Sequence, residues 1–250
     1  MKIYIVNLPR CRDRRENILG ECARFELEPE AIYGVDGQNL TEAELRELVF
    51  DRDRNPLGRG EIGCALSHLG IYRDMIDKDI PLALILEDDS VFNLDPRPLL
   101  EALARQPADV PEVYLLTHRD NIYIAGNRPR QVGTFKFHRG WRGAGANGYV
   151  ITNKAAANIL SFQTPLKVVS DYWKFFQLYD LIRFYICEKE IIGLHPETSQ
   201  ASASLLENDR QTAGLLRKKY FRRIRKQAPL IGKVKLYFFK IRNLPKIRYQ

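Results

Sequence analysis

The stretch LALILEDDSVF, residues 82–92, joins a run of apolar residues to the densest acidic cluster of the chain. The apolar run, residues 82–86, is typical of a strand that is buried on both faces. Glu87, Asp88 and Asp89 follow at once, and carboxylates packed this closely repel one another and resist burial unless a positive charge lies among them. The stretch therefore predicts either an ordinary polar turn or a cation site at the end of a buried strand.

Predicted strands alternate with predicted helices on both sides of this stretch. We expect strands at residues 2–8, 31–35, 82–86, 113–117, 148–152 and 183–189, and helices at 10–25, 41–50, 61–77, 94–103 and 153–162. Such alternation predicts a mostly parallel α/β sheet flanked by helices, and sheets of this kind place their ligands at the carboxyl ends of the strands. The acidic cluster lies at such an end, where clustered oxygens favour a hard divalent cation, Mg²⁺ or Mn²⁺.

The composition and the cysteines are those of a globular protein. A hydrophobic share of 45% and a charged share of 28% are ordinary, and 250 residues are enough for a sizeable core. The sequence has no run of about 18 apolar residues, so no transmembrane helix is expected. The first residues, MKIYIVNLPRCRDRR, lack the features of a signal peptide, and the four cysteines have no metal-ligand spacing. We therefore expect a cytoplasmic protein with reduced thiols.

The positive charge of the chain is concentrated in one segment. Residues 215–250 contain 13 Lys or Arg and no Asp or Glu, which leaves 26 basic against 31 acidic residues in the rest. Within LLRKKYFRRIRKQ, residues 215–227, the apolar positions 216, 220 and 224 share one face of a predicted helix. A basic amphipathic segment on an acidic body predicts docking on an anionic membrane. A helix packed on the body and an RNA-binding tail are the alternatives. The expected division is a domain of residues 1–210 and a basic segment of residues 211–250.

Five stretches follow one another in an order that resembles a known family. They are IVNLPRCRDRR (5–15), GEIGCALSH (60–68), ILEDD (85–89), GANGYVITNKAA (145–156) and VVSDYW (168–173). Over about residues 1–205 the chain resembles the family 25 glycosyltransferases of lipopolysaccharide and lipooligosaccharide biosynthesis. The resemblance implies a GT-A-type, Rossmann-like fold and a metal-dependent, inverting β-galactosyltransferase that uses UDP-galactose. It further implies a core-oligosaccharide acceptor on a glycolipid, at the inner face of the bacterial inner membrane, and we expect no nucleic acid partner.

The resemblance also implies a metal site. Asp89 would be the primary ligand of Mn²⁺ (or Mg²⁺) in a DxD-type motif whose first position is Glu87 in this chain. Glu87 and Asp88 would assist, through the nucleotide ribose or metal-bound water, and the division of labour among the three acids stays open. His195 is the candidate third protein ligand, because such folds commonly supply a late histidine; a surface histidine before a proline is the alternative.

Residues at and just after the end of the first predicted strand are candidates for binding the UDP-sugar donor. Asn7, Leu8 and Arg10 lie where the resemblance seats the nucleotide. Arg14 or Arg15 would reach a phosphate or the uracil, and a solvated helical turn is the alternative for these arginines.

The start of the helix predicted at residues 61–77 is a second candidate for donor binding. Gly60 and a second glycine flank Glu61, and free amides at a helix start suit an anion. Ser67 and His68 lie about a turn later, and the resemblance favours a role for both in holding the donor. A packed histidine between leucines is the alternative.

Two later stretches supply the remaining candidates, for donor binding and for catalysis. In RGAGANGYV, residues 142–150, glycines such as Gly145 would let the backbone lie close to a sugar, with Asn147 and Tyr149 supplying polar contacts. A tight loop into a strand is the alternative. Asp171 is the candidate general base, because an inverting transfer needs a carboxylate to take the proton of the acceptor hydroxyl. A capping role for Asp171 at the start of a helix is the alternative.

Other classes of protein are compatible with the same residues. One is a nucleotidyltransferase or another nucleotide-sugar enzyme on a similar sheet. Another is a non-catalytic protein that binds carbohydrate or nucleic acid.

Overall fold

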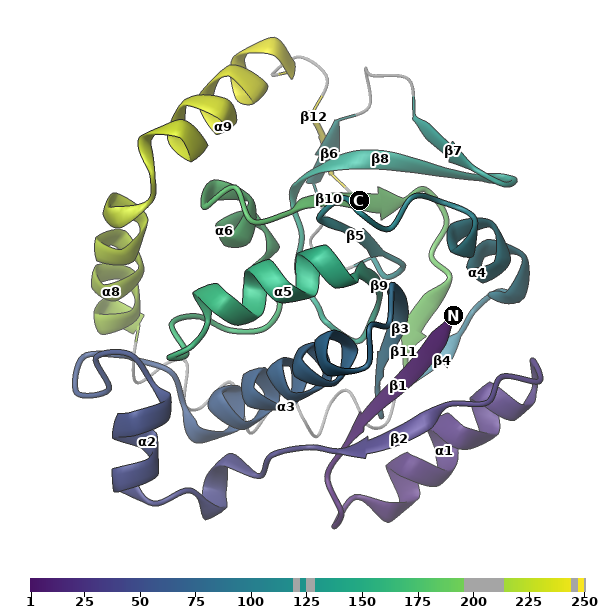
Figure 1. Cartoon of the computed structure of the whole chain (residues 1–250), viewed down its shortest axis with the longest axis horizontal. Helices are drawn as coiled ribbons and strands as arrows, with labels where there is room; N and C mark the ends of the chain where they lie inside the picture. The colour runs from purple at the N-terminus through teal and green to yellow at the C-terminus, as the bar shows by residue number, and fades with distance from the viewer. Residues whose placement is uncertain (119–121, 125–128, 196–213, 244–246, 250) are drawn as a thin grey trace.

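The computed structural model describes residues 1–118, 122–124, 129–195, 214–243 and 247–249 of the chain (Figure 1). The strands are β1 Lys2–Asn7, β2 Glu30–Tyr33, β3 Leu82–Glu87, β4 Ser90–Phe92, β5 Glu112–Leu115, β6 Ile122–Ile124, β7 Arg130–Val132, β8 Phe135–Arg142, β9 Gly148–Thr152, β10 Arg183–Cys187, β11 Ile192–Leu194 and β12 Ile247–Tyr249. The helices are α1 Arg12–Ala23, the 3-10 helix η1 Gly37–Asn39, α2 Glu42–Leu48, α3 Arg59–Asp77, α4 Arg97–Ala104, α5 Asn153–Phe162, α6 Trp173–Leu178, α8 Gly214–Gln227 and α9 Leu230–Asn243.

Ten of the described strands form one large sheet with the order β12-β6-β8-β10-β5-β9-β3-β1-β2, in which β7 also pairs with β8. β1 runs parallel to both β2 and β3, and β5 runs parallel to β10. β9 lies antiparallel between β3 and β5, and β8 is antiparallel to β10. Five of these strands therefore share one direction, namely β2, β1, β3, β5 and β10, whereas β9 and β8 run in the opposite direction. The predicted mostly parallel α/β sheet flanked by helices is confirmed, with β9 as the reversed strand in its centre.

Strand β3 shows why the chain needs the apolar run at residues 82–86. Successive side chains of a strand point to opposite faces of the sheet, and here both faces are covered. Ala83 and Ile85 pack in the core shared with α3, α5 and α6, whereas Leu84 and Leu86 pack in the core shared with α1 and α4. Figure 1 shows α3 and α5 lying across one face of the sheet. The whole run is buried, so the predicted buried strand is confirmed.

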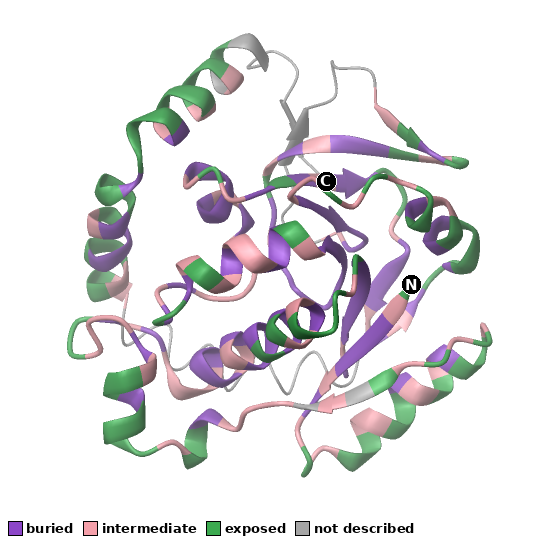
Figure 2. Cartoon of the chain, in the orientation of Figure 1, coloured by how far each residue is buried: buried purple, intermediate pink, exposed green. Residues whose placement is uncertain are grey.

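Helix α8 packs its apolar face on the body of the protein. Tyr220, Phe221 and Ile224 are buried in the core that also holds α3 and α5. The Tyr220 hydroxyl accepts a hydrogen bond from Asn55 Nδ2 at 3.0 Å. The expectation that positions 216, 220 and 224 face a membrane is therefore corrected, because two of them lie in the core while Leu216 stays exposed. Figure 2 shows this helix with buried residues along one side.

A short strand pair that the sequence does not predict follows the acidic turn. β4 pairs antiparallel with β11, and Ser90 lies opposite Leu194 in that pairing. Because β4 begins directly after Asp89, the pairing brings His195, the residue after β11, next to the turn.

The start of α3 lies tightly against the loop that follows β2. A Cβ on Gly63 would lie 2.5 Å from the carbonyl oxygen of Val35, a distance that real Cβ atoms do not tolerate. Ser67 Oγ donates a hydrogen bond to the Gly63 carbonyl at 2.7 Å and accepts one from the Val35 N–H at 2.8 Å. The glycine and the serine of GEIGCALSH thus fix α3 in place beside the end of the sheet.

Across the ranges that the structure describes, no helix has both the length and the apolar character needed to span a bilayer.

Candidate active site

The acidic turn lies at the carboxyl end of β3 and is held from two sides. Asp88 and Asp89 are buried. The Glu87 N–H donates to the carbonyl oxygen of Asn147 at 3.1 Å, and the His195 N–H donates to the carbonyl oxygen of Asp89 at 2.8 Å. Backbone from the start of β9 and the end of β11 thus fixes the turn, which differs from a solvated loop in both burial and hydrogen bonding.

A guanidinium lies among the carboxylates of the turn. Arg14, in the first turn of α1, forms ion pairs with Asp88 and, at 3.3 Å, with Asp89. Asn7, at the end of β1, donates from Nδ2 to Asp88 Oδ2 at 2.8 Å. Asn7 ends the first strand and Arg14 lies in the helix that follows it, and the structure brings both side chains to the acidic turn. Arg14 supplies a positive charge of the kind that a buried acidic cluster requires.

The arginine does not fully offset the buried negative charge. Burial raises the pKa of Asp89 to about 7; the charge of Glu87 adds to the effect, and that of Arg14 opposes it. Burial also raises the pKa of Asp88, although Arg14 and Asn7 act to lower it. An additional cation would favour the ionised carboxylates, so the turn has the electrostatic capacity to bind one.

Three buried side-chain oxygens at the turn lack a hydrogen-bond partner within the described part of the chain. They are Asp89 Oδ1, Asn7 Oδ1 and Asn147 Oδ1. Leaving a buried polar atom unsatisfied costs about 1–3 kcal/mol, so such atoms at one place call for a ligand. Carboxylate and amide oxygens are the ligands that Mg²⁺ and Mn²⁺ prefer in proteins. The residues of the turn therefore fit a hard divalent cation.

A buried chain of hydrogen bonds holds Glu87 from the side of α3. His68 Nε2 lies 3.2 Å from Glu87 Oε1, and His68 Nδ1 lies 2.8 Å from the Tyr149 hydroxyl. The Tyr149 hydroxyl in turn lies 2.7 Å from that of Tyr72. His68 and Tyr149 are both fully buried. Tyr149 thus lies behind the site, which corrects its expected contact with a sugar, and His68 acts on the site through Glu87.

Cys64 belongs to the same cluster, and the sequence analysis missed it. Its Sγ lies 3.8 Å from Glu87 Oε1, and it precedes His68 by four residues on α3, so both side chains lie on one helix face. This four-residue spacing of Cys64 and His68 is the sequence signal that indicates a shared site for the two side chains. The ligand atoms of Cys64, His68 and Glu87 lie within 4.8 Å of one another, close enough to share a metal ion. Burial, with the charge of Glu87 adding to it, raises the pKa of the Cys64 thiol well above its ordinary value. Through these contacts Cys64 and His68 position the Glu87 carboxylate from the side of α3.

The glycine-rich stretch before β9 holds Asp171. Gly145 has a φ of +84°, in the left-handed region that favours glycine, and its N–H donates to Asp171 Oδ2 at 2.9 Å. Trp173 Nε1 donates to the Gly145 carbonyl oxygen at 3.0 Å. No side chain caps the start of α6, so the capping alternative for Asp171 is wrong. Ser170 Oγ lies 3.5 Å from Cys64 Sγ. Asp171, the next residue, therefore lies beside α3, whose Cys64 and His68 contact Glu87.

The carboxylate of Glu61 is used inside the protein. It accepts hydrogen bonds at 2.8 and 2.9 Å from Arg217 of α8, and another at 3.2 Å from the Gly58 N–H. Gly60 lies beside it in the first turn of α3. The Glu61 carboxylate thus binds the first turn of α3 and Arg217 of α8, which corrects its expected contact with a donor.

The remaining candidates lie around the end of β1. Arg10 is exposed and pairs with Asp36. Leu8 and Arg15 are half-buried. A role in donor binding stays a prediction for these three residues.

Taken together, the fold and this site define an α/β protein with a candidate divalent-cation site at the carboxyl edge of its sheet. The family model of glycosyltransferase family 25 (LPS biosynthesis protein) matches residues 1–173, and the chain belongs to that family. The resemblance carried by the five sequence stretches is confirmed by this match.

Relatives of the chain include eukaryotic galactosyltransferases. Human procollagen galactosyltransferase 2 is 36% identical over 99 residues, which are 36% of this chain and 16% of that protein. Procollagen galactosyltransferase 1-A of Xenopus laevis is 23% identical over 217 residues, or 74% of this chain and 34% of the relative. Human inactive glycosyltransferase 25 family member 3 is 30% identical over 110 residues, or 41% of this chain and 18% of the relative. The chain thus matches between 16% and 34% of the length of these proteins, and the family contains inactive members.

Among solved structures, one similar chain is a glycosyltransferase involved in the glycosylation of the major capsid of PBCV-1. The two chains share 12% identity with a TM-score of 0.35, over 74% of this chain and 82% of the other. A likeness this distant carries no argument about activity.

Proposed function

We propose that this chain is a metal-dependent, inverting hexosyltransferase of GT-A type. Its donor is a UDP-sugar, UDP-galactose in the first instance, and its acceptor is the core oligosaccharide of a bacterial lipooligosaccharide or lipopolysaccharide. The observation that carries the proposal is the buried acidic turn, where oxygens of Asp89, Asn7 and Asn147 lack hydrogen-bond partners within the described residues. Family membership and relatives named galactosyltransferases support the choice of hexose.

The cation site of this proposal consists of Asp89 with Glu87 and His195, and the ion is Mn²⁺ or Mg²⁺. Asp89 is assigned the leading role because its Oδ1 is buried and lacks a hydrogen bond within the described chain. A bound cation supplies charge neutralisation for the diphosphate leaving group. The protein holds Glu87 through His68, and it holds the backbone of Asp89 through the N–H of His195.

Arg14 and Asn7 are proposed to serve the donor from the opposite side of the turn. Both already contact Asp88, the acid assigned to the ribose or to metal-bound water. The Arg14 side chain is partly exposed, so a diphosphate beside the turn can reach its guanidinium.

Asp171 is proposed as the general base that takes the proton from the acceptor hydroxyl. The Gly145 N–H hydrogen-bonds to Oδ2 of this carboxylate, which fixes its orientation. Asp171→Asn keeps the size of the side chain and removes its basicity. We therefore expect a fall in turnover of at least about a hundredfold, with binding of UDP unchanged. Near-normal turnover of this variant would remove Asp171 from the mechanism.

The acceptor and the place of action follow from the same proposal. We place the glycolipid acceptor at the inner face of the bacterial inner membrane, so the enzyme would work there as a peripheral protein. The basic segment of residues 211–250, set against a domain of residues 1–210, supports this location by its charge.

The test is release of UDP from a panel of donors, with and without an oligosaccharide acceptor. We expect Mn²⁺-dependent release from UDP-galactose, weaker release from UDP-glucose and UDP-N-acetylglucosamine, and loss of release in Asp89→Ala. Asp109→Ala, at an exposed acid outside the site, is the matched control. Binding of UDP without transfer from any donor would instead favour a non-catalytic protein, like the inactive relatives.

A further inference from the structure

Helix α9 carries an apolar face that no described part of the chain covers. The face consists of Leu230, Ile231, Val234, Tyr237, Phe238 and Ile241. These side chains are between 41% and 76% exposed, and their spacing places them on one side of a helix. Figure 2 shows α9 exposed along most of its length. A contiguous set of large exposed apolar residues marks an interaction site.

The opposite side of α9 is attached to the body, which fixes the direction of the apolar face. A Cβ on Gly232 would collide with the carbonyl oxygen of Leu178, so the helix backbone lies against α6 at this point. Phe239 stacks on Trp141 of β8, with the ring centroids 5.9 Å apart. The apolar face therefore points away from the protein, whereas the apolar face of α8 is buried in the core.

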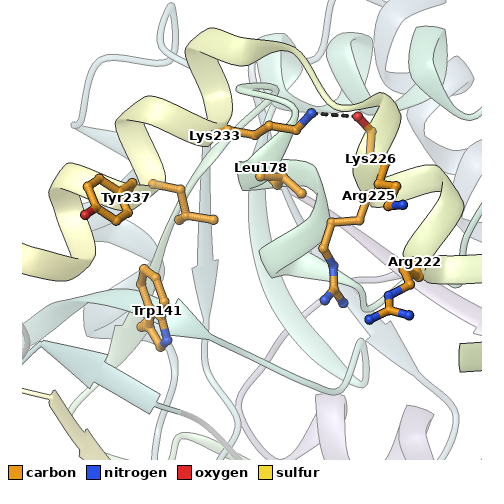
Figure 3. A pocket seen from close by; sticks show the side chains of 8 residues that line it. Trp141, Leu178, Arg222, Arg225, Lys226, Lys233 and Tyr237 are labelled. Carbon is orange, nitrogen blue, oxygen red and sulfur yellow. Dashed lines mark hydrogen bonds between the residues drawn. The ribbon is translucent and has the colours of Figure 1, made fainter.

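Cations gather beside this face in a groove between α8, α9, α6 and β8 (Figure 3). The groove has a volume of about 540 Å³, and its lining includes Arg222, Arg225, Lys226 and Lys233, with Tyr237 at one side. Lys233 Nζ donates to the Lys226 carbonyl oxygen at 2.6 Å. In the described chain no carboxylate pairs with Arg222 or Arg225, and residues 215–250 contain no acid that could do so. Positive charge without a counter-charge thus borders the apolar face.

We propose that α9 lies flat on an anionic lipid bilayer. Its apolar face enters the boundary between headgroups and acyl chains, and the groove cations contact lipid phosphates. Charge complementarity favours an anionic lipid surface over a second copy of the chain. Two copies would bring two acid-free segments of 13 cations each against one another. The anchor is thus α9, and the cations of α8 assist it.

This inference goes beyond the transfer reaction, because binding to vesicles is measured without donor or acceptor. Failure of vesicle binding would remove the proposed peripheral location but leave the proposed transfer reaction untouched, and an inactive protein would still be expected to bind vesicles.

The experiment is co-sedimentation of the full chain with vesicles of phosphatidylcholine alone, or of phosphatidylcholine mixed with phosphatidylglycerol. We expect binding to the anionic vesicles, weakened by salt. Loss of Ile231 and Phe238 in the variant I231S/F238S should lower the affinity by at least about tenfold, because both side chains leave the apolar face. L94S, at an exposed leucine outside α9, is the matched control and should bind like the wild type.

The groove is tested separately with R222Q/R225Q. This variant should lose most of the preference for anionic vesicles while its melting temperature stays near that of the wild type, because neither arginine is paired in the described chain. Equal binding of the wild type to both kinds of vesicle, no binding at all, or full binding by I231S/F238S would each overturn the proposal. A dimer in solution that I231S/F238S dissociates would overturn it as well, since the face would then belong to an interface between two copies.

Discussion

Replacing Arg217 by methionine tests whether α8 is part of the folded body. Arg217 donates two hydrogen bonds to Glu61, whose carboxylate is almost fully buried. Methionine keeps much of the length of the side chain but removes its charge, so Arg217→Met would leave the buried carboxylate of Glu61 without its guanidinium partner. Removing one partner of a buried pair costs about 3–5 kcal/mol of unfolding free energy. Because the Arg217 side chain is itself 20% exposed, we expect the lower end of this range, about 3 kcal/mol.

A double-mutant cycle separates the charge effect from the loss of packing. Glu61→Gln removes the buried charge, so the double variant Glu61→Gln/Arg217→Met should be more stable than Arg217→Met alone. The expected coupling between the two positions is about 2 kcal/mol. Arg46→Met is the matched control, because Arg46 forms an exposed pair with Asp53 at 3.8 Å and should lose less than about 1 kcal/mol.

The assay is urea unfolding followed by circular dichroism, with the free energies compared at similar slopes. A loss of unfolding free energy in Arg217→Met no larger than that in Arg46→Met would show that the pair with Glu61 does not hold α8 on the body. Additivity of the two substitutions in the cycle would show the same, since the pair would then not be coupled.

Three further predictions concern α3, the acidic turn and the buried chain behind it. Gly63→Ala should lower the unfolding free energy by about 2 kcal/mol or more, because its Cβ would lie 2.5 Å from the Val35 carbonyl oxygen; an unchanged urea midpoint would show that α3 can shift freely. The raised pKa of Asp89, about 7, means that protonation of this carboxyl stabilises the metal-free fold at low pH, and that this contribution is lost as the pH rises through 7. Protons compete with Mn²⁺ for the same group, so calorimetry should show Mn²⁺ affinity rising about tenfold per pH unit up to pH 7 and then levelling; a flat profile would contradict this. Tyr149→Phe should cost about 1–3 kcal/mol in urea unfolding at unchanged core volume, because it removes the hydroxyl 2.8 Å from His68 Nδ1; a neutral result would show that the buried hydrogen bond contributes nothing.

The sequence predicted the central strand and the acidic turn because both depend on local pattern. Residues 82–86 are apolar on both faces of the sheet, and the acids follow in the next three positions. Arg14, whose guanidinium pairs with Asp88 in the structure, lies 74 residues earlier in the chain. Its charge run fits a solvated turn equally well, so only the packing of α1 against the sheet places it.

His195 and α8 show two further limits of local pattern. His195 reaches the turn because β4 and β11 pair, and strands of three residues carry too little periodicity to be predicted. The spacing of Tyr220 and Ile224 reveals an apolar helix face, but a face that packs on a protein core and one that enters a membrane have the same spacing. The tertiary structure decides between them.

We propose above that the acidic turn binds a nucleotide diphosphate through a divalent cation. The most direct measurement is the melting temperature of the wild type and of Asp89→Ala with UDP, in Mn²⁺ and in EDTA, with CMP and ATP as control nucleotides. We expect UDP to raise the melting temperature of the wild type much more in Mn²⁺ than in EDTA. Asp89→Ala should lose this difference, and CMP and ATP should leave the melting temperature of the wild type unchanged. An equal shift in EDTA, or a full Mn²⁺-dependent shift in Asp89→Ala, would contradict the proposal.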